Sequence, residues 1–283
     1  MSENVTVVIK TMLRPKSLER LVASVLKFYP NIQILIGDDG EPSCEEYIMN
    51  RFKGKNNIHY YNLPHDSGLS YGRNFLLNKV ETEYFLLCDD DFVIDKTLKF
   101  DQLIHIIEEK NIDILGGYLK NYKIVKSFKD KIIVLGQKIL RYELNTNYLG
   151  KFEQVDDVLK VYYSRYEFPE YTDTELCLNF FLAKTDAIKR MTGWDENLKL
   201  QEHTEFFYRA KKEGIKVGFS NKMSVKHMPV QLKHYENKRL RNYTPIFIKK
   251  YNFKEIQSYY KDENGKNVKV YLNENDDLTV EKI

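Results

Sequence analysis

The chain has 283 residues, of which 42% are hydrophobic and 13% aromatic. That content is enough to bury a large core in one or two domains, which excludes a disordered chain. Lysine and arginine outnumber aspartate and glutamate by only 44 to 41, so the net charge of +3 gives no global field that would favour nucleic acid as a partner.

The first 117 residues alternate between short apolar strands and amphipathic helices. Apolar strands separated by helices imply parallel pairing, right-handed crossovers and helices on both faces of the sheet. This half of the chain therefore predicts a nucleotide-binding type of α/β sheet. Strands are predicted at residues 5–10, 32–40, 58–63, 84–92 and 112–117, and helices at 16–30, 43–52, 69–80 and 98–110.

Beyond Gly117 the pattern changes. Residues 118–125 and 131–144 are typical of an antiparallel ribbon, and we expect the second half of the sheet in the acidic and aromatic stretch 153–171. The polar tail that runs to Ile283 is interpreted as a mobile hairpin. Further strands are predicted at 175–184, 215–219 and 223–227, a helical turn at 184–191, and a helix at 204–214 that ends on a glycine.

Two acidic clusters follow predicted strands. Asp38 and Asp39 come after "IQILIG", and Asp89, Asp90 and Asp91 come after "EYFLLC". In an open parallel sheet ligands bind beyond the carboxyl ends of the strands, and carboxylates crowded there near neutral pH need shared protons or a cation. Mg²⁺ or Mn²⁺ that carries a nucleoside diphosphate would supply that cation. The alternative is a solvated acidic turn or a helix N-cap.

The three cysteines, Cys44, Cys88 and Cys177, are widely spaced and odd in number. They form no C-x-x-C pair, so the sequence indicates neither a disulfide framework nor a zinc knuckle, and it favours a reducing cytoplasm. The first residues pass quickly into an amphipathic pattern, and no apolar run reaches about 18 residues. We therefore expect neither secretion nor a membrane span.

Five segments together resemble a known family. They are "VTVVIKTMLRPKSLERLVASVLKFYPNIQILIGDDG", "GLSYGRN", "CDDDF", "NFFLAKTD" and "QEHTEFF". In this order and spacing they are similar to the A-fold inverting glycosyltransferases of family 2, and closely so to the β-1,4-N-acetylgalactosaminyltransferases. The resemblance runs from about residue 5 to about residue 228. It implies a Rossmann-like glycosyltransferase A-type fold: an α/β, mostly parallel sheet with helices on both faces and a small antiparallel ribbon on the acceptor side.

The resemblance implies a binding site for a UDP-sugar donor. Asp39 would accept a hydrogen bond from the uracil edge, and the main chain around Thr11 would line the base. Arg14 would belong to the same donor site. Arg73, in "GLSYGRN", would lie between the acidic cluster and the diphosphate, although a surface helix arginine is the alternative.

The same resemblance assigns roles to the second acidic cluster. Asp89 would face the ribose, Asp90 would belong to the donor site or turn outward, and Asp91 would bind Mn²⁺ or Mg²⁺. His227 matches the place where such enzymes supply a late histidine to the metal or the diphosphate. A structural histidine at the end of a strand is the alternative for that position.

An inverting transfer also needs a general base for the acceptor hydroxyl. The family places an acid-rich motif at the start of a helix for this purpose, and here a histidine replaces the usual aspartate in "QEHTEFF". His203 is the base candidate by position, and Glu202 and Glu205 are the carboxylate candidates. The base assignment stays open. Trp194 would stack on an acceptor sugar or pack in the core, and Asn179 would open the strand beneath the donor sugar.

The sequence divides into a catalytic domain, 1–228, and a C-terminal extension, 229–283. The catalytic domain comprises a nucleotide-binding half, 1–117, and an acceptor-binding half, 118–228. Residues 222–254 carry nine basic residues against one acid, interleaved with aromatic residues. This stretch could close on the diphosphate, contact the anionic inner face of a membrane, or form an ordinary solvated helix. The residues that could close on the diphosphate are Lys238, Arg239 and Arg241.

The expected function is transfer of an N-acetylhexosamine or hexose from a UDP-sugar to a glycan or glycolipid acceptor in surface polysaccharide or glycolipid synthesis. A sugar-nucleotide nucleotidyltransferase is the second hypothesis, but its first strand should lead into a glycine-rich loop, and "KTMLRPKS" contains no glycine. A non-catalytic glycan-binding relative is the third, because a histidine stands at the position of the base. The sequence predicts no oligomeric state.

Overall fold

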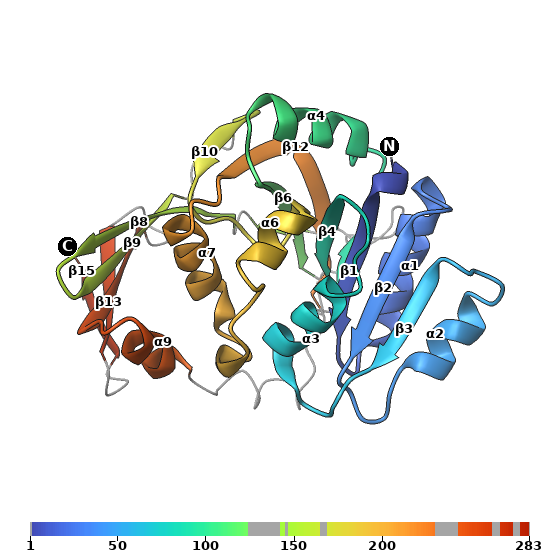
Figure 1. Cartoon of the computed structure of the whole chain (residues 1–283), viewed down its shortest axis with the longest axis horizontal. Coiled ribbons are helices and arrows are strands. Elements are labelled where there is room, and N and C mark those ends of the chain that lie inside the picture. The colour runs from blue at the N-terminus through green and yellow to red at the C-terminus, as the bar shows by residue number, and fades with distance from the viewer. Residues whose placement is uncertain are drawn as a thin grey trace, which may run out of the picture.

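The chain forms a large central sheet and a smaller second sheet, with helices packed on and between them (Figure 1). The computed structural model describes residues 2–123, 142–144, 147–164, 169–229, 243–261, 267–273 and 278–282. Within these residues the central sheet has ten strands and the second sheet five.

The first half of the central sheet is parallel, as the sequence predicts. β1 (Val5–Thr11) pairs with β2 (Gln33–Asp38) on one side and with β4 (Tyr84–Asp89) on the other, and β3 (Ile58–Asn62) pairs with β2. The carboxyl ends of these strands therefore lie at one edge. The preceding 3-10 turn and the helices of this half are η1 (Ser2–Asn4), α1 (Pro15–Phe28), α2 (Glu45–Arg51), α3 (Gly68–Leu77) and α4 (Phe100–Glu109).

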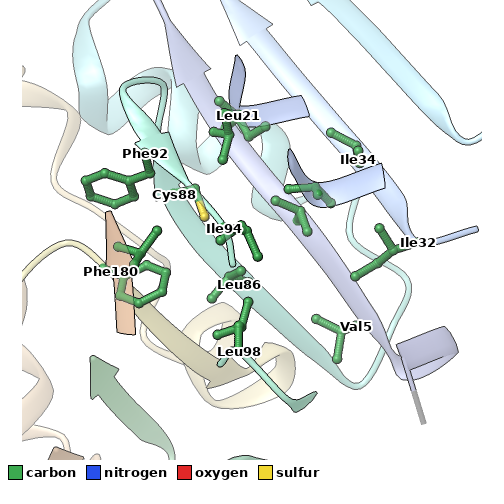
Figure 2. Packing of buried hydrophobic residues seen from close by; sticks show 14 of the residues in the cluster. Val5, Leu21, Ile32, Ile34, Leu86, Cys88, Phe92, Ile94, Leu98 and Phe180 are labelled. Carbon is green, nitrogen blue, oxygen red and sulfur yellow. The ribbon is translucent and has the colours of Figure 1, made fainter. Parts of the chain in front are cut away.

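Both faces of these strands are buried. In β1, Val7 and Ile9 pack in one core cluster and Val8 in another, because successive side chains of a strand point to opposite faces. Figure 2 shows part of the first cluster, which includes Leu21 of α1 and Leu86 and Cys88 of β4. Helices therefore cover both faces, which confirms the predicted layers.

The second half of the central sheet continues from β4 through β11 (Phe181–Lys184), which is antiparallel to its neighbours β4 and β6 (Ile114–Lys123). β12 (Val217–His227) then pairs in parallel with β6. The two short strands predicted at 215–219 and 223–227 are therefore one strand, because an irregularity between Phe219 and Ser224 interrupts the pairing without ending it. The remaining strands are β5 (Phe92–Val93), β7 (Tyr142–Leu144) and β10 (Thr172–Thr174).

The stretch 153–171 does not supply the second half of the central sheet, so that prediction is wrong. β8 (Leu149–Val155) and β9 (Val158–Ser164) form a hairpin in the second sheet, because their apolar side chains pack against α7 (Glu202–Lys212). Phe152 contacts Tyr208 of α7, and Phe206 of the same helix contacts Phe181 of β11. α7 therefore lies between the two sheets (Figure 1).

The C-terminal strands complete the second sheet. β13 (Glu255–Lys261) pairs in parallel with β9, and β14 (Asn267–Asn273) forms the predicted hairpin with β13 before β15 (Leu278–Lys282). The extension and the β8–β9 hairpin therefore share one sheet. The other elements are α6 (Thr185–Arg190), η2 (Glu196–Leu198) and α9 (Thr244–Lys250).

Two further features bear on the sequence expectations. Cys44, Cys88 and Cys177 are buried free thiols. In the part of the chain that the structure describes, no helix has both the length and the apolar character that crossing a bilayer requires.

Candidate active site

A polar cleft of about 440 Å³ opens at the edge where β1, β2 and β4 end and α3 begins. This is where an open α/β sheet binds its ligands. Three segments that are far apart in the sequence meet here: the strand ends of the first half, the end of β12, and the loop that precedes α7. The cleft is lined by Lys10, Thr11, Met12, Arg14, Asp39, Asp66, Gly68, Leu69, Arg73, Asp89, Asp90, Asp91, Asn179, Leu200, Gln201 and His227.

Two arginines pair with the three consecutive aspartates. Nη1 of Arg14 lies 2.9 Å from Oδ1 of Asp90 and 3.2 Å from Oδ2 of Asp91. Nη2 of Arg73 lies 3.4 Å from Oδ1 of Asp89. The protein therefore supplies part of the positive charge that this acidic run requires.

Asp90 was expected either to belong to the donor site or to turn outward. It does not turn outward. Its side chain is buried, because Oδ2 accepts a hydrogen bond of 2.7 Å from the hydroxyl of Thr11 while Oδ1 faces Arg14. The two partners draw the carboxylate under the end of β1. Asp90 thus joins β4 to the turn before α1.

The surroundings of the three carboxyl groups shift their pKa values in different directions. Burial raises the pKa of Asp90 to about 6, and the nearby Arg14 opposes this only in part. Burial also raises the pKa of Asp89, against the attraction of Arg73. At Asp91 burial has the same tendency, but the hydrogen bond and charge of His227 outweigh it and hold the pKa below its usual range. Asp91 is therefore the member that stays ionised most readily.

His227 ends β12 directly beside Asp91. Its Nδ1 bonds the amide oxygen of Asn121, which is an acceptor only, so Nδ1 carries the hydrogen. Its Nε2 faces Asp91, 3.4 Å from Oδ1. Without a cation, Nε2 donates its hydrogen toward Asp91. A metal ion bound beside Asp91 would take the place of that hydrogen at Nε2.

The residues at this end of the cleft fit a divalent cation that takes few ligands from the protein. No cluster of three or more histidine, cysteine or acidic side chains suited to a metal occurs among the described residues. Mg²⁺ and Mn²⁺ commonly use one or two protein groups and take their other ligands from substrate phosphates and water. Asp91 and His227 match that arrangement.

The opposite end of the cleft is built around Asp39. One carboxylate oxygen pairs with the ammonium group of Lys10, and the other accepts a 2.9 Å hydrogen bond from the backbone N–H of Gly68. Asp38 points elsewhere: its oxygens bond Gly40, Cys44 and Tyr60 and shape the turn after β2. Only Asp39 of this acidic pair faces the cleft.

Arg73 links the acidic run to α7. Besides Asp89, its guanidinium group pairs with Glu202, and both of these side chains are buried. The guanidinium carbon also lies 5.7 Å from the centre of the Trp194 ring, which stacks on Phe206 at 4.7 Å. Trp194 is only 3% exposed. Of the two roles predicted for Trp194, packing in the core therefore matches its position, and stacking on an acceptor sugar does not.

His203 follows Glu202 in the first turn of α7. Its Nδ1 lies 2.8 Å from the amide oxygen of Asn179, which lines the cleft, whereas Nε2 is buried without a hydrogen-bond partner among the described residues. Burial lowers the pKa of His203 to about 3, helped by the positive charge of Arg73. The ring is therefore neutral, and Nε2 holds an unused lone pair.

Glu205 is not brought to the cleft. It is fully buried about one turn further along α7, where its carboxylate meets Arg209 at 2.9 Å, Lys250 at 2.7 Å and the hydroxyl of Tyr251 at 2.8 Å. These contacts join α7 to α9. The position indicates a structural function for Glu205.

Comparison with known proteins decides the family. A model described as glycosyl transferase family 2 matches residues 6–167, which is more than half of the chain. The chain belongs to glycosyltransferase family 2.

Curated relatives agree with this assignment. The mouse β-1,4 N-acetylgalactosaminyltransferase 2 is 30% identical over 209 residues, a match that covers 72% of this chain and 35% of the relative. The mouse β-1,4 N-acetylgalactosaminyltransferase 1 is 31% identical over 204 residues, with the same coverage. The chain thus spans about a third of the length of the curated relatives it matches.

Solved structures confirm the glycosyltransferase A-type fold. Residues 1–349 of S. aureus TarS in complex with UDP-GlcNAc align with a TM-score of 0.57 at 18% identity, over 87% of this chain and 64% of that chain. GalNAc-T7 with UDP, GalNAc and Mn²⁺ aligns with a TM-score of 0.59 at 15% identity, over 81% and 44%. At such low identity the likeness shows the fold alone.

Several residues of the cleft were not predicted. Leu200 and Gln201 come from the loop before α7, and no local pattern places that loop against α3. Lys10 did have a signal, because it is a charged residue at the end of the otherwise apolar run of β1. The residues 230–242, with Lys238, Arg239 and Arg241, lie outside the described part of the chain.

We expect Glu205→Ala to destabilise the protein by about 3–5 kcal/mol, because the mostly buried guanidinium group of Arg209 loses its carboxylate partner. Urea unfolding followed by circular dichroism measures this free energy. Glu213→Ala, which removes an exposed glutamate at the end of the same helix, is the control and should change little. Unaltered stability together with lost activity in Glu205→Ala would instead support the catalytic prediction.

Proposed function

We propose that the chain is a metal-dependent inverting transferase that moves a sugar, an N-acetylhexosamine or a hexose, from a UDP-sugar to a glycan or glycolipid. The observation that carries the proposal is the cleft at the carboxyl edge of the sheet, which brings together most of the residues expected to bind a UDP-sugar and a metal. These are Thr11, Arg14, Asp39, Arg73, Asp89, Asp90, Asp91 and His227.

Asp91 and His227 would hold Mn²⁺ or Mg²⁺, with the donor's phosphates as the remaining ligands. When bound, such an ion supplies positive charge to the departing diphosphate. Arg14 and Arg73 reach the same end of the cleft and add charge that stays fixed. Because guanidinium groups can bond two oxygens at once, they suit a diphosphate as well as the aspartates.

His203 would accept the proton of the acceptor hydroxyl. Asn179 fixes its Nδ1–H, so the ring presents a lone pair at Nε2. A buried group without a partner is a cost to the folded protein, and a bound hydroxyl would offset it. Glu202 is the alternative base: one of its oxygens pairs with Arg73 and the other has no partner among the described residues.

The setting in which the enzyme works is part of the proposal. A cytoplasmic enzyme that builds surface polysaccharide or glycolipid at the inner membrane face fits the three free thiols, since disulfides are rare in reducing compartments. The N-acetylgalactosaminyltransferase relatives favour UDP-N-acetylgalactosamine as the first donor to test.

Asp91→Asn should abolish the dependence of UDP binding on Mn²⁺ while the protein stays folded, because a neutral amide replaces the carboxylate with little change in volume. Isothermal titration with UDP, with and without Mn²⁺, measures the effect. Asp101→Asn in α4, an exposed aspartate outside the cleft, is the control. Metal-dependent binding that survives in Asp91→Asn would remove Asp91 from the metal site.

His203→Ala should reduce the turnover rate of UDP-N-acetylgalactosamine about 10²- to 10⁴-fold, the range for loss of a general base. The affinity for UDP should stay near that of the wild type, since His203 does not line the donor cleft. The assay is release of UDP in the presence of Mn²⁺. If Glu202→Gln shows the larger loss of turnover and His203→Ala retains activity, Glu202 is the base.

The ring of His203 should remain neutral from pH 8 down to pH 5. Its pKa of about 3 in the folded state lies far below the value of about 6.5 for an unfolded chain, so acid protonates the unfolded state first. Stability contributed by the neutral ring is therefore lost progressively as the pH falls below about 6.5. NMR titration of the ring, with the urea-unfolded protein as reference, checks this. Protonation near pH 6.5 in the folded protein would contradict it.

A further inference from the structure

A lysine stands at the cleft end of a strand that is otherwise apolar. Lys10 follows Ile9 in β1, and its side chain is only 4% exposed. Burying an ammonium group is costly unless it is paired and hydrogen-bonded. Burial does lower the pKa of Lys10, and the carboxylate of Asp39 is the largest opposing influence. The chain therefore holds a cation in a place where an apolar residue would fill the strand.

The bonds of Lys10 leave one of its donors unused. Its Nζ donates to the backbone oxygen of Thr11 at 2.8 Å and to Oδ1 of Asp39. An ammonium group has three hydrogens, so one remains without an acceptor among the described residues. Lys10 and Asp39 both line the cleft. A hydrogen-bond donor and a carboxylate acceptor thus lie side by side in its wall.

Structural stabilisation alone does not account for this pair. Buried ion pairs contribute little to stability on balance, because the desolvation of both charges offsets their attraction. Asp39 is also anchored independently, since its second oxygen accepts from the N–H of Gly68 at the start of α3. Lys10 and Asp39 would therefore be positioned in advance to bind a ligand that has a matching donor and acceptor.

We propose that Lys10 is a specificity-determining residue that reads the base of the donor nucleotide together with Asp39. Asp39 accepts the N3–H of uracil, and the remaining hydrogen of Lys10 is donated to O4, the carbonyl oxygen that cytosine replaces with an amino group. This inference rests on the proposed function, which places the nucleoside of a UDP-sugar at Asp39. The inference adds Lys10 to Asp39 as a second residue that recognises the base.

Such a pair distinguishes uracil from cytosine. Uracil presents a donor at N3 between two carbonyl acceptors, whereas cytosine presents a lone pair at N3 and an amino group in place of O4. With the ribose and diphosphate fixed, cytosine would set its N3 lone pair against the carboxylate of Asp39. Sites built from buried hydrogen-bonding groups reject a ligand that leaves those groups unpaired.

The position of the Lys10 ammonium group depends on a glycine in α3. A Cβ atom on Gly72 would lie 2.4 Å from Cδ and 2.6 Å from Cε of Lys10. The lysine stem therefore runs across the bare backbone of Gly72 to reach Asp39. Gly72→Ala would displace the ammonium group without removing its charge, and alanine favours a helix more than glycine does.

The experiment measures binding of UDP, CDP and inorganic pyrophosphate, each with Mn²⁺, to the wild type, Lys10→Met and Gly72→Ala. In both variants UDP affinity should fall roughly 10- to 100-fold, the value of one hydrogen bond to a charged group. The weaker binding of CDP should change little, so the preference for UDP over CDP shrinks. Pyrophosphate, which occupies only the diphosphate end, should bind as in the wild type. Lys184→Met, which removes another strand lysine paired with a glutamate, is the matched control.

Each other result overturns the proposal in a different way. Unchanged UDP affinity in Lys10→Met would show that Lys10 does not contact the base. An equal loss for UDP and pyrophosphate would show that it only maintains the shape of the cleft. If Lys10→Met does not fold, Gly72→Ala decides by the same measurements. A wild type that binds pyrophosphate but not UDP would overturn the proposal and the proposed function together.

Discussion

The acidic run at the end of β4 is the constraint around which the site is arranged. Three adjacent carboxylates, two of them buried, can stand at a strand end only if cations reach them from other elements. Arg14 does so from the start of α1, and Arg73 does so from α3. Each arginine thereby fixes the position of its own helix relative to β4. The ion pairs that balance the charge of the aspartates therefore also determine the shape of the cleft.

Arg73 carries this constraint into the second half of the molecule. Its pairing with Glu202 ties the first turn of α7 to the nucleotide-binding half, and the Trp194 ring covers it from the core side. His203 therefore stands next to a fixed positive charge, which helps to keep its ring neutral. One buried guanidinium group thus anchors the turn that carries a candidate base and adds to the burial that keeps that base neutral.

The sequence predicted the parts of this arrangement that depend on local pattern. Alternating apolar strands and helices gave the parallel half of the sheet, and the aspartates at its strand ends marked the cleft. What it missed depends on contacts between distant segments. The β8–β9 hairpin was assigned to the wrong sheet because its apolar faces fit either sheet until the position of α7 is known. Glu205 shares the first turn of α7 with Glu202, and its i, i+4 pair with Arg209 is local, but only tertiary packing brings Lys250 and Tyr251 onto its carboxylate.

The pairing of Arg14 with two aspartates at once has a consequence for ligand binding. Its Nη1 lies closer to Asp90 than to Asp91, and Asp90 has Thr11 as a further partner. Asp91 can therefore give up its share of the arginine while Asp90 keeps Arg14 in place. Because its pKa is also lowered, Asp91 is the carboxylate of the run that stays ionised most readily. Under the proposed function, Asp91 would exchange its share of Arg14 for a metal ion, while Asp90 would hold Arg14 in place.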